Sequence, residues 1–315
     1  RANDPKALDQ YTAEHPFTPQ EATLQVTANL FDVTSLKEQY NKVKAHDLHS
    51  EGTAGVLYHN KDGKVSFRAS QEVTPVIKFP HRKGDKTEGA VVVYASPYKT
   101  KEGETPHNLY FVCHDPYAQS KSTSNESLGA AYVIKRPNNL SKPDDIIVAS
   151  YVGRPKTQDE YNRNLFMLAE YYNAKIGFEN DRGELIAYAK RYRKLHKLQE
   201  EFEMLDKREL RSRNVKRQYG MHMTEQRKRQ GELYIRDWLI TPRHTDEEGN
   251  VTLNLHKIYD PALLQELIKF NHRGNFDRVM AFMVGMYHTR ELYNREVTEI
   301  ISDRSQDDWF DKIYS

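Results

Sequence analysis

Apolar and polar residues alternate in short runs through the first part of this 315-residue chain. Residues 55–67 (GVLYHNKDGKVSF) alternate on both sides of Asp62-Gly63, a pair that tolerates the positive φ angles of a tight turn. This pattern predicts a β-hairpin. Further strands are predicted at Val76–Phe79 and at Ala90–Tyr94, where β-branched and aromatic residues dominate.

The middle of the chain predicts an antiparallel meander followed by a crossover. Three apolar runs are separated by polar loops and predict neighbouring antiparallel strands: Leu109–His114, Leu128–Lys135 and Ile146–Val152. A helix is expected over Thr157–Asn173, since Thr157 and Glu160 have the spacing of an N-cap and its capping acid. It leads to a fourth strand at Ala174–Glu179. A helical crossover implies that this fourth strand pairs in parallel.

Elsewhere the apolar residues recur with the period of α-helices. Helices are predicted over Thr34–Lys44, Gly183–Leu205, Thr224–Leu239, Pro261–Phe270 and from about Phe276 to Tyr293. Residues 1 to about 45 have helical character, with an N-cap, a proline and an acid in Thr18-Pro19-Gln20-Glu21. We therefore expect linker helices and a small β accessory region over residues 1–107, and an α/β domain over residues 108–315.

Composition excludes some protein classes. No run of eighteen apolar residues is present, and the N-terminus (RANDPKALDQ) lacks the apolar stretch of a signal peptide, so the sequence supports neither a membrane nor a secreted protein. The single cysteine, Cys113, cannot form an internal disulfide and has no CxxC partner for zinc, which fits a reducing cytoplasm. We interpret it as a core residue.

Charge is unevenly distributed along the chain. Residues 182–230 contain fifteen Lys and Arg against seven Asp and Glu, whereas residues 231–315 contain ten against fifteen. A basic segment beside an acidic one suits a protein that meets a polyanion on one face and holds cations in a cleft on another. The alternative is that long charged helices have solvated faces.

Three acidic residues fall at positions where the predicted elements converge. Asp115 ends the first strand of the meander, Glu179 ends the fourth strand, and Asp277 opens a strongly apolar helix. Three antiparallel strands, a helix and a further strand are the layout of the ribonuclease H-like fold, a mixed sheet flanked by helices. Hydrolysis of a phosphodiester with two divalent cations requires converging carboxylates, because Mg²⁺ and Mn²⁺ prefer hard oxygen ligands. Each acid alone also has an ordinary explanation, as a turn former, a loop residue or a partner of the helix dipole.

At these residues the chain resembles the C-terminal nuclease region of the large terminase subunit of tailed bacteriophages, the DNA-packaging motor. The resemblance covers essentially the whole chain and is most specific over residues 108–290. It rests on the motifs HDPY (114–117), SYVGRP (150–155), YYNA (171–174) before FEN (178–180), and FDRVMA (276–281). Upstream, EHPFTPQEA (14–22) resembles the segment by which such proteins leave their ATPase domain.

The resemblance implies an endonuclease that cuts concatemeric double-stranded viral DNA during packaging. Asp115, Glu179 and Asp277 would be catalytic and would hold two divalent cations, Mg²⁺ or Mn²⁺. The implied partners are double-stranded DNA, the terminase ATPase domain, the small terminase subunit and the portal, and the implied location is the host cytoplasm at the procapsid portal. Two departures are His114, where a small or apolar residue is more usual, and Arg278, where a second acid is common. Asp181 could substitute for that acid, although a solvated loop residue is the simpler interpretation.

The basic segment gains a role from this resemblance. Arg208, Arg211, Arg213, Lys216 and Arg217, followed by the run 227–229 (RKR), are expected to contact DNA phosphates without reading sequence. A GxxxxGK[ST] phosphate loop is absent from the sequence, so ATP-driven translocation is not expected from this chain.

Two other functions remain open at this point. One is another ribonuclease H-like nuclease of the resolvase or integrase type, although no helix-turn-helix or zinc pattern accompanies the acids. The other is a catalytically silent scaffold that docks DNA or the portal. Manganese binding at the acids would separate the scaffold from both nucleases.

Overall fold

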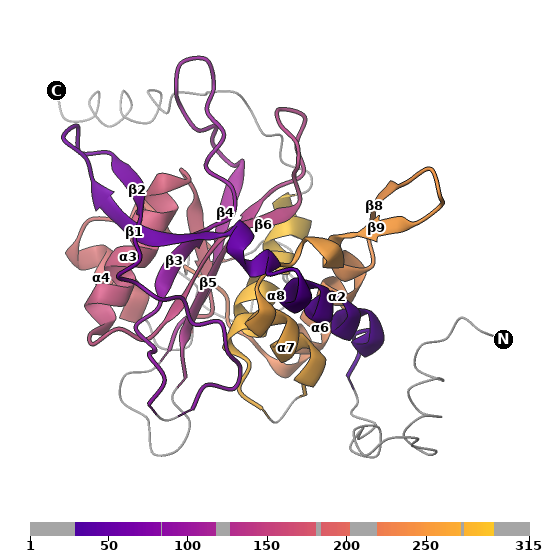
Figure 1. Cartoon of the computed structure of the whole chain (residues 1–315). Coiled ribbons are helices and arrows are strands. Elements are labelled where there is room, and N and C mark those ends of the chain that lie inside the picture. Colours follow the sequence, from indigo (N-terminus) through magenta and orange to yellow (C-terminus); the bar gives the residue numbers. More distant parts are fainter. Residues whose placement is uncertain are drawn as a thin grey trace, which may run out of the picture.

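A seven-stranded mixed sheet forms the centre of the molecule (Figure 1). The computed structural model describes residues 29–82, 84–117, 127–180, 184–201, 219–271 and 274–292. The sheet has the strand order β2-β1-β3-β6-β5-β4-β7. Its strands are β1 (Thr53–His59), β2 (Val65–Ala69), β3 (Ala90–Val93), β4 (Tyr110–Asp115), β5 (Gly129–Lys135), β6 (Ile146–Gly153) and β7 (Lys175–Phe178).

The connections of β4 to β7 define the fold. β4 pairs antiparallel with β5, and β5 pairs antiparallel with β6. Helix α3 (Gln158–Tyr171) then crosses over, and β7 pairs in parallel with β4. Thr157 caps α3 by accepting a hydrogen bond from the Glu160 amide, at 3.2 Å. The α/β fold is therefore ribonuclease H-like, and the predicted meander, crossover and parallel pairing are confirmed.

Helices cover both faces of the sheet (Figure 1). α3 and α4 (Glu184–Arg191) pack on one face, and α8 (Asp277–Leu292) packs on the other with α2, α6 and α7 around it. The remaining elements are α2 (Val33–Ala45), η1 (Leu48–Glu51), η2 (Leu195–Lys197), α6 (Glu225–Leu239), η3 (Asn254–Lys257) and α7 (Pro261–Lys269), with the two-stranded hairpin β8 (Pro242–Thr245) and β9 (Val251–Leu253). None of the helices in the described part of the chain could span a bilayer.

The predicted hairpin is present and belongs to the central sheet. β1 and β2 pair antiparallel around a turn in which Gly63 has a φ of 73°. β1 also pairs with β3, and β3 pairs with β6, so strands before and after residue 107 share one sheet. The predicted division of the chain into two regions at residues 107 and 108 stays a prediction.

Two predicted elements are wrong in part. Val76–Phe79 is not a strand: prolines at 75 and 80 flank it, and the Phe79 amide donates to the Gln265 side chain. The helix predicted over Gly183–Leu205 is short, because α4 ends at Arg191 and the chain turns through Arg193 at a φ of 55°.

The residues after that turn pack beside β7 rather than extending the helix. The Gln199 amide donates to the carbonyl of Ile176, at 2.8 Å, so backbone pairing with the sheet outweighs helical periodicity there. The hairpin of β8 and β9 was not predicted, because its strands are short and mostly exposed. The N-cap predicted at residues 18–21 lies outside the described residues.

Candidate functional site

Two of the predicted acids lie at the ends of parallel neighbouring strands. Asp115 is the last residue of β4, and Glu179 directly follows β7. The register pairs His114 with Phe178, and the Glu179 amide donates to the His114 carbonyl at 3.3 Å. The backbones that carry the two acids therefore leave the sheet at the same edge.

Strand alternation also directs both acids to the same face. Successive side chains on a strand point to opposite faces. Cys113 belongs to the core cluster beneath α8, and a Cβ built on Gly177 would meet the Phe111 ring of that cluster. Two residues further along each strand, Asp115 and Glu179 return to the α8 face.

Asp277, the third predicted acid, is the first residue of α8 and is only 7 % exposed. Its carboxylate accepts hydrogen bonds from the Ser127 hydroxyl at 2.6 Å, from the Leu128 amide at 2.9 Å and from the Asn275 side chain at 3.3 Å. Leu128 lies two residues before Ala130, the partner of Asp115 in β5. These bonds therefore bring Asp277 to the sheet edge where β4 ends.

Tyr161 of α3 lies close to two of the acids from the opposite face of the sheet. Burial raises its hydroxyl pKa first, and the negative charges of Asp115 and Asp277 are among the groups that raise it further. Its ring stacks on His114, with centroids 5.4 Å apart.

His114 is itself buried on the Tyr161 side of the sheet. Its Nδ1 lies 3.0 Å from the Ala130 carbonyl, and a carbonyl can only accept, so Nδ1 carries the proton. Burial lowers the pKa of His114 to about 4. His114 is therefore neutral at pH 7 and packs beneath α3, on the face opposite Asp115.

The chemistry of this edge suits a divalent cation, although an assembled site is not visible in the described residues. Asp115, Glu179 and Asp277 offer only carboxylate oxygens, the ligands that Mg²⁺ and Mn²⁺ prefer. Burial raises the pKa of Asp277, against the lowering effect of its donors from Ser127 and Leu128, so its buried negative charge would gain from a nearby cation. Over the described ranges, no three His, Cys, Asp or Glu residues group as a metal site.

The predicted DNA contacts come from two stretches of the chain, residues 208–217 and the run 227–229. Arg208, Arg211, Arg213, Lys216 and Arg217 lie outside the described residues, as does Asp181. Arg227, from the basic run after them, is turned inward: its side chain is 12 % exposed and lies 3.7 Å from the Glu201 carboxylate. Arg227 is therefore less available to a phosphate than its sequence context suggested.

Ser127 and Arg154 belong to this edge and were not predicted as site residues. Arg154 follows β6, donates to the Ser127 carbonyl at 2.7 Å, and lies over the Tyr117 ring at 5.0 Å. Arg154 thus fixes the backbone of Ser127, whose hydroxyl donates a hydrogen bond to the Asp277 carboxylate. Arg154 could have been found from the SYVGRP motif, whereas Ser127 lies in a serine-rich loop (SKSTSNES, 120–127) with no distinguishing signal.

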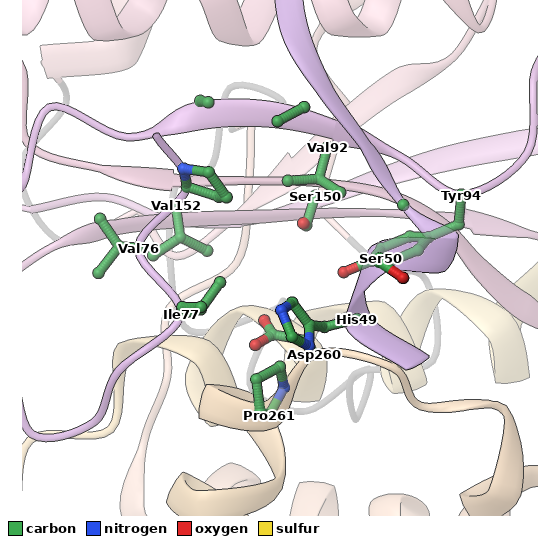
Figure 2. Close-up of a pocket in the computed structure, with 14 residues that line it drawn as sticks. His49, Ser50, Val76, Ile77, Val92, Tyr94, Ser150, Val152, Asp260 and Pro261 are labelled. Carbon is green, nitrogen blue, oxygen red and sulfur yellow. The ribbon is translucent and has the colours of Figure 1, made fainter. Parts of the chain in front are cut away.

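A cavity of about 120 Å³ lies on the α8 face of the sheet, and none of the three acids lines it (Figure 2). Ser150 and Val92 line it from the strands, Asp260 from the start of α7, and His49 from η1. The Asp260 carboxylate already accepts bonds from the Tyr132 hydroxyl and from the amides of 262 and 263. Because Asp260 is satisfied internally and none of the three acids lines the cavity, the cavity is not the candidate site.

Comparison with known proteins gives structural matches only. No protein-family model matches the chain, and no curated protein matches it in sequence. The large terminase nuclease from thermophilic phage G20c with bound magnesium aligns at 14 % identity and a TM-score of 0.37, covering 64 % of this chain and 89 % of that chain. The same nuclease with bound zinc aligns at 11 % identity and a TM-score of 0.36, covering 67 % and 92 %. At such TM-scores the fold assignment rests on the strand order and connections described above.

Proposed function

We propose that this protein is a metal-dependent endonuclease that cuts concatemeric double-stranded DNA during viral genome packaging. The observation that carries the proposal is the in-register parallel pairing of β4, which ends at Asp115, with β7, which Glu179 directly follows. Asp277, which accepts a hydrogen bond from Leu128 just before β5, lies at the same edge. The role in packaging rests on the sequence motifs that resemble the large terminase subunit.

In this proposal Asp115, Glu179 and Asp277 together bind the metal ions. Asp115 is the central ligand, since β4 lies between β5 and β7. Leu128, the residue before β5, binds Asp277, and Glu179 directly follows β7. Two divalent cations, Mg²⁺ or Mn²⁺, would supply Lewis-acid stabilisation of the charge that develops on the phosphoryl group. Ser127 and Leu128 would hold the Asp277 carboxylate in place through their hydrogen bonds.

The partners belong to the same proposal. The basic residues from Arg208 to Arg217 would bind the DNA backbone. By resemblance, the ATPase domain, the small terminase subunit and the portal would bring DNA to this nuclease in the host cytoplasm.

One observation favours a second candidate, the catalytically silent scaffold. The Asp277 carboxylate already accepts hydrogen bonds from the Ser127 hydroxyl, the Leu128 amide and the Asn275 side chain. In the scaffold the acids would serve local structure only, as the hydrogen bonds of Asp277 do. Metal binding is therefore the measurement that separates the two candidates.

The first test is plasmid cleavage by the wild-type chain and by Asp115→Asn with Mn²⁺, Mg²⁺ or EDTA. Loss of an outer-sphere partner typically costs about 10- to 100-fold in metal affinity or activity, so loss of a ligand should reduce cleavage at least about 100-fold. EDTA should abolish it.

The matched control is Asp159→Asn, the same substitution in an exposed ion pair with Arg191 on the surface of α3. It should cut like the wild type. Retained cleavage in Asp115→Asn would overturn the assignment. Wild-type protein that neither cuts DNA nor binds Mn²⁺ in calorimetry would favour the scaffold.

A further inference from the structure

The first turn of α8 is capped by a carboxylate from a different helix. Glu266 of α7 accepts hydrogen bonds from the amides of Arg278 and Val279, at 2.8 and 3.2 Å. Amides in the first turn of a helix have no partner within the helix, and a nearby side chain normally supplies one. Glu266 therefore serves α8 as a tertiary N-cap.

The same carboxylate also holds the side chain that follows Asp277. Arg278 Nη1 donates to Glu266 at 2.9 Å, and Nη2 donates to the Val76 carbonyl at 2.6 Å. Both Arg278 and Glu266 are only 1 % exposed. Since Glu266 holds the backbone and the side chain of one residue together, it fixes the rotation of the helix as well as its position.

A second acid connects this pair to the sheet. Asp260 Oδ2 lies 3.5 Å from Arg278 Nε and accepts a hydrogen bond from the Tyr132 hydroxyl of β5 at 2.7 Å. Asp260 also caps α7 through the amides of 262 and 263. Val76 and Asp260, which both contact Arg278, line the cavity in Figure 2. The start of α8 is thus fixed to α7 and to β5 at once.

Stability alone is a weak explanation for this arrangement. Desolvation offsets much of the attraction in a buried ion pair, and apolar residues of similar volume often serve as well. The pair lies one residue from Asp277, whose carboxylate must meet Ser127 and Leu128 at the sheet edge. A rotation of the first turn of α8 would move Asp277 away from that edge.

We propose that Glu266 and Arg278 are positioning residues, which hold the first turn of α8 so that the Asp277 carboxylate faces the edge where Asp115 and Glu179 emerge. This inference rests on the proposed function, because it concerns the orientation of one ligand of the proposed metal site. It also gives a role to Arg278 at a position where the resembling family commonly has a second acid.

The test compares Mn²⁺ affinity, measured by electron paramagnetic resonance, in the wild type, Glu266→Gln and Arg278→Lys. Glu266→Gln keeps the side-chain volume but loses the ion pair, and Arg278→Lys keeps the charge but loses the forked geometry. We expect Mn²⁺ affinity to fall about 10- to 100-fold in Glu266→Gln, the usual effect of losing an outer-shell partner. Arg278→Lys should lose less Mn²⁺ affinity than Glu266→Gln. If Glu266→Gln does not fold, the Mn²⁺ affinity of Arg278→Lys tests the positioning role by itself.

The matched control is Asp144→Asn. Asp144 is another buried carboxylate that holds a backbone amide, that of Asn138, and a cation, Lys142. It lies before β6, at the opposite end of the sheet from the three acids. The Mn²⁺ affinity of the Asp144→Asn variant should stay within about twofold of the wild-type value. This change is much smaller than the one expected when an outer-shell partner of a metal ligand is removed.

Hydrogen exchange in metal-free protein gives a second measurement. The amides of 278 and 279 should exchange faster in Glu266→Gln and unchanged in Asp144→Asn. Glutamine has a single, uncharged side-chain oxygen, so it cannot accept from these amides and from the Arg278 guanidinium as the carboxylate does with its two oxygens. The inference would be wrong, with the proposed function unaffected, if Glu266→Gln and Arg278→Lys both bound Mn²⁺ with wild-type affinity. It would also be wrong if Asp144→Asn lost as much Mn²⁺ affinity as Glu266→Gln. Absence of Mn²⁺ binding in the wild type would overturn the proposed function and this inference with it.

Discussion

The thiol of Cys113 shows how strongly burial controls the chemistry of a single residue here. Cys113 is fully buried in β4 beneath α8, and its Sγ lies 3.4 Å from the Tyr132 carbonyl. Burial raises the pKa of this thiol to about 12. The thiolate is the reactive form, so both access and ionisation oppose reaction in the folded protein.

We therefore expect Cys113 to resist thiol reagents in native buffer, even when the pH is raised from 7 to 9. Raising the pH across this range stays below a pKa of about 12, so the thiolate remains a minor form. Labelling with a chromogenic disulfide should become rapid only in denaturant. Since the chain contains one cysteine, the signal is unambiguous. Stoichiometric labelling of folded protein within minutes would contradict the buried placement.

Individual residues differ in how far the sequence predicts their roles. Asp115 was predictable as a strand-end acid, because Pro116 stops an apolar strand immediately after it. Glu266 was not, because it lies in an ordinary amphipathic helix and acquires its role only when α7 meets α8. The inward orientation of Arg227 likewise depends on Glu201, which the fold brings close to it.

At the scale of elements, one glycine determines how closely α8 approaches the sheet. A Cβ built on Gly285 would lie 2.6 Å from Ile134 Cδ1 and 2.9 Å from Cys113 Sγ. Real Cβ atoms do not come so close to other heavy atoms, so the glycine allows contact between α8 and the strands β4 and β5. This packing carries Asp277, at the start of the helix, to the sheet edge.

Gly285→Ala should therefore destabilise the fold despite the better helix propensity of alanine. Overpacking typically costs about 1–3 kcal/mol, while replacing glycine in a helix gains about 1 kcal/mol, so the net loss should be on the order of 1 kcal/mol. The measurement is urea unfolding of the single variants and of the double variant with Ile134→Val, which removes Cδ1. We expect Gly285→Ala to lower the free energy of unfolding less in the Ile134→Val background than in the wild type. Additive effects would show that the Ile134 contact does not limit the approach of α8.

Elements were predicted well where local signals agreed with the tertiary fold. α3 has its cap at Thr157 and a clear apolar stripe, and both were visible in the sequence. The segment after Arg191 has helical periodicity, but its backbone groups pair beside β7. Val76–Phe79 has strand-forming residues, but its backbone groups bond to the side chains of Arg278 and Gln265. Contacts with residues distant in the sequence determine the conformation of these two segments, and such contacts cannot be read from a single sequence.

At the scale of the whole molecule, the two predicted regions are joined through the sheet and through helices. β3 pairs with β6 over Ala90–Val93, and the Tyr94 amide continues the contact to Val148. Gln39 of α2 donates to the Ile258 carbonyl at 3.1 Å, so the N-terminal region also packs near α7 (Figure 1). Neither connection could be predicted, because strand order across the boundary depends on pairing between distant segments.

This connectivity predicts the behaviour of a fragment that starts at residue 108. The fragment would lose β1, β2, β3 and α2, leaving β6 as an open edge whose side chains from Ile147 to Gly153 are buried in the whole chain. An exposed apolar edge strand promotes self-association. We expect the fragment to elute as aggregates in gel filtration and to lack a cooperative thermal transition, while the full chain shows one. A monomeric fragment that unfolds cooperatively would instead establish residues 108–315 as an independently folding domain, with the preceding strands as an accessory to it.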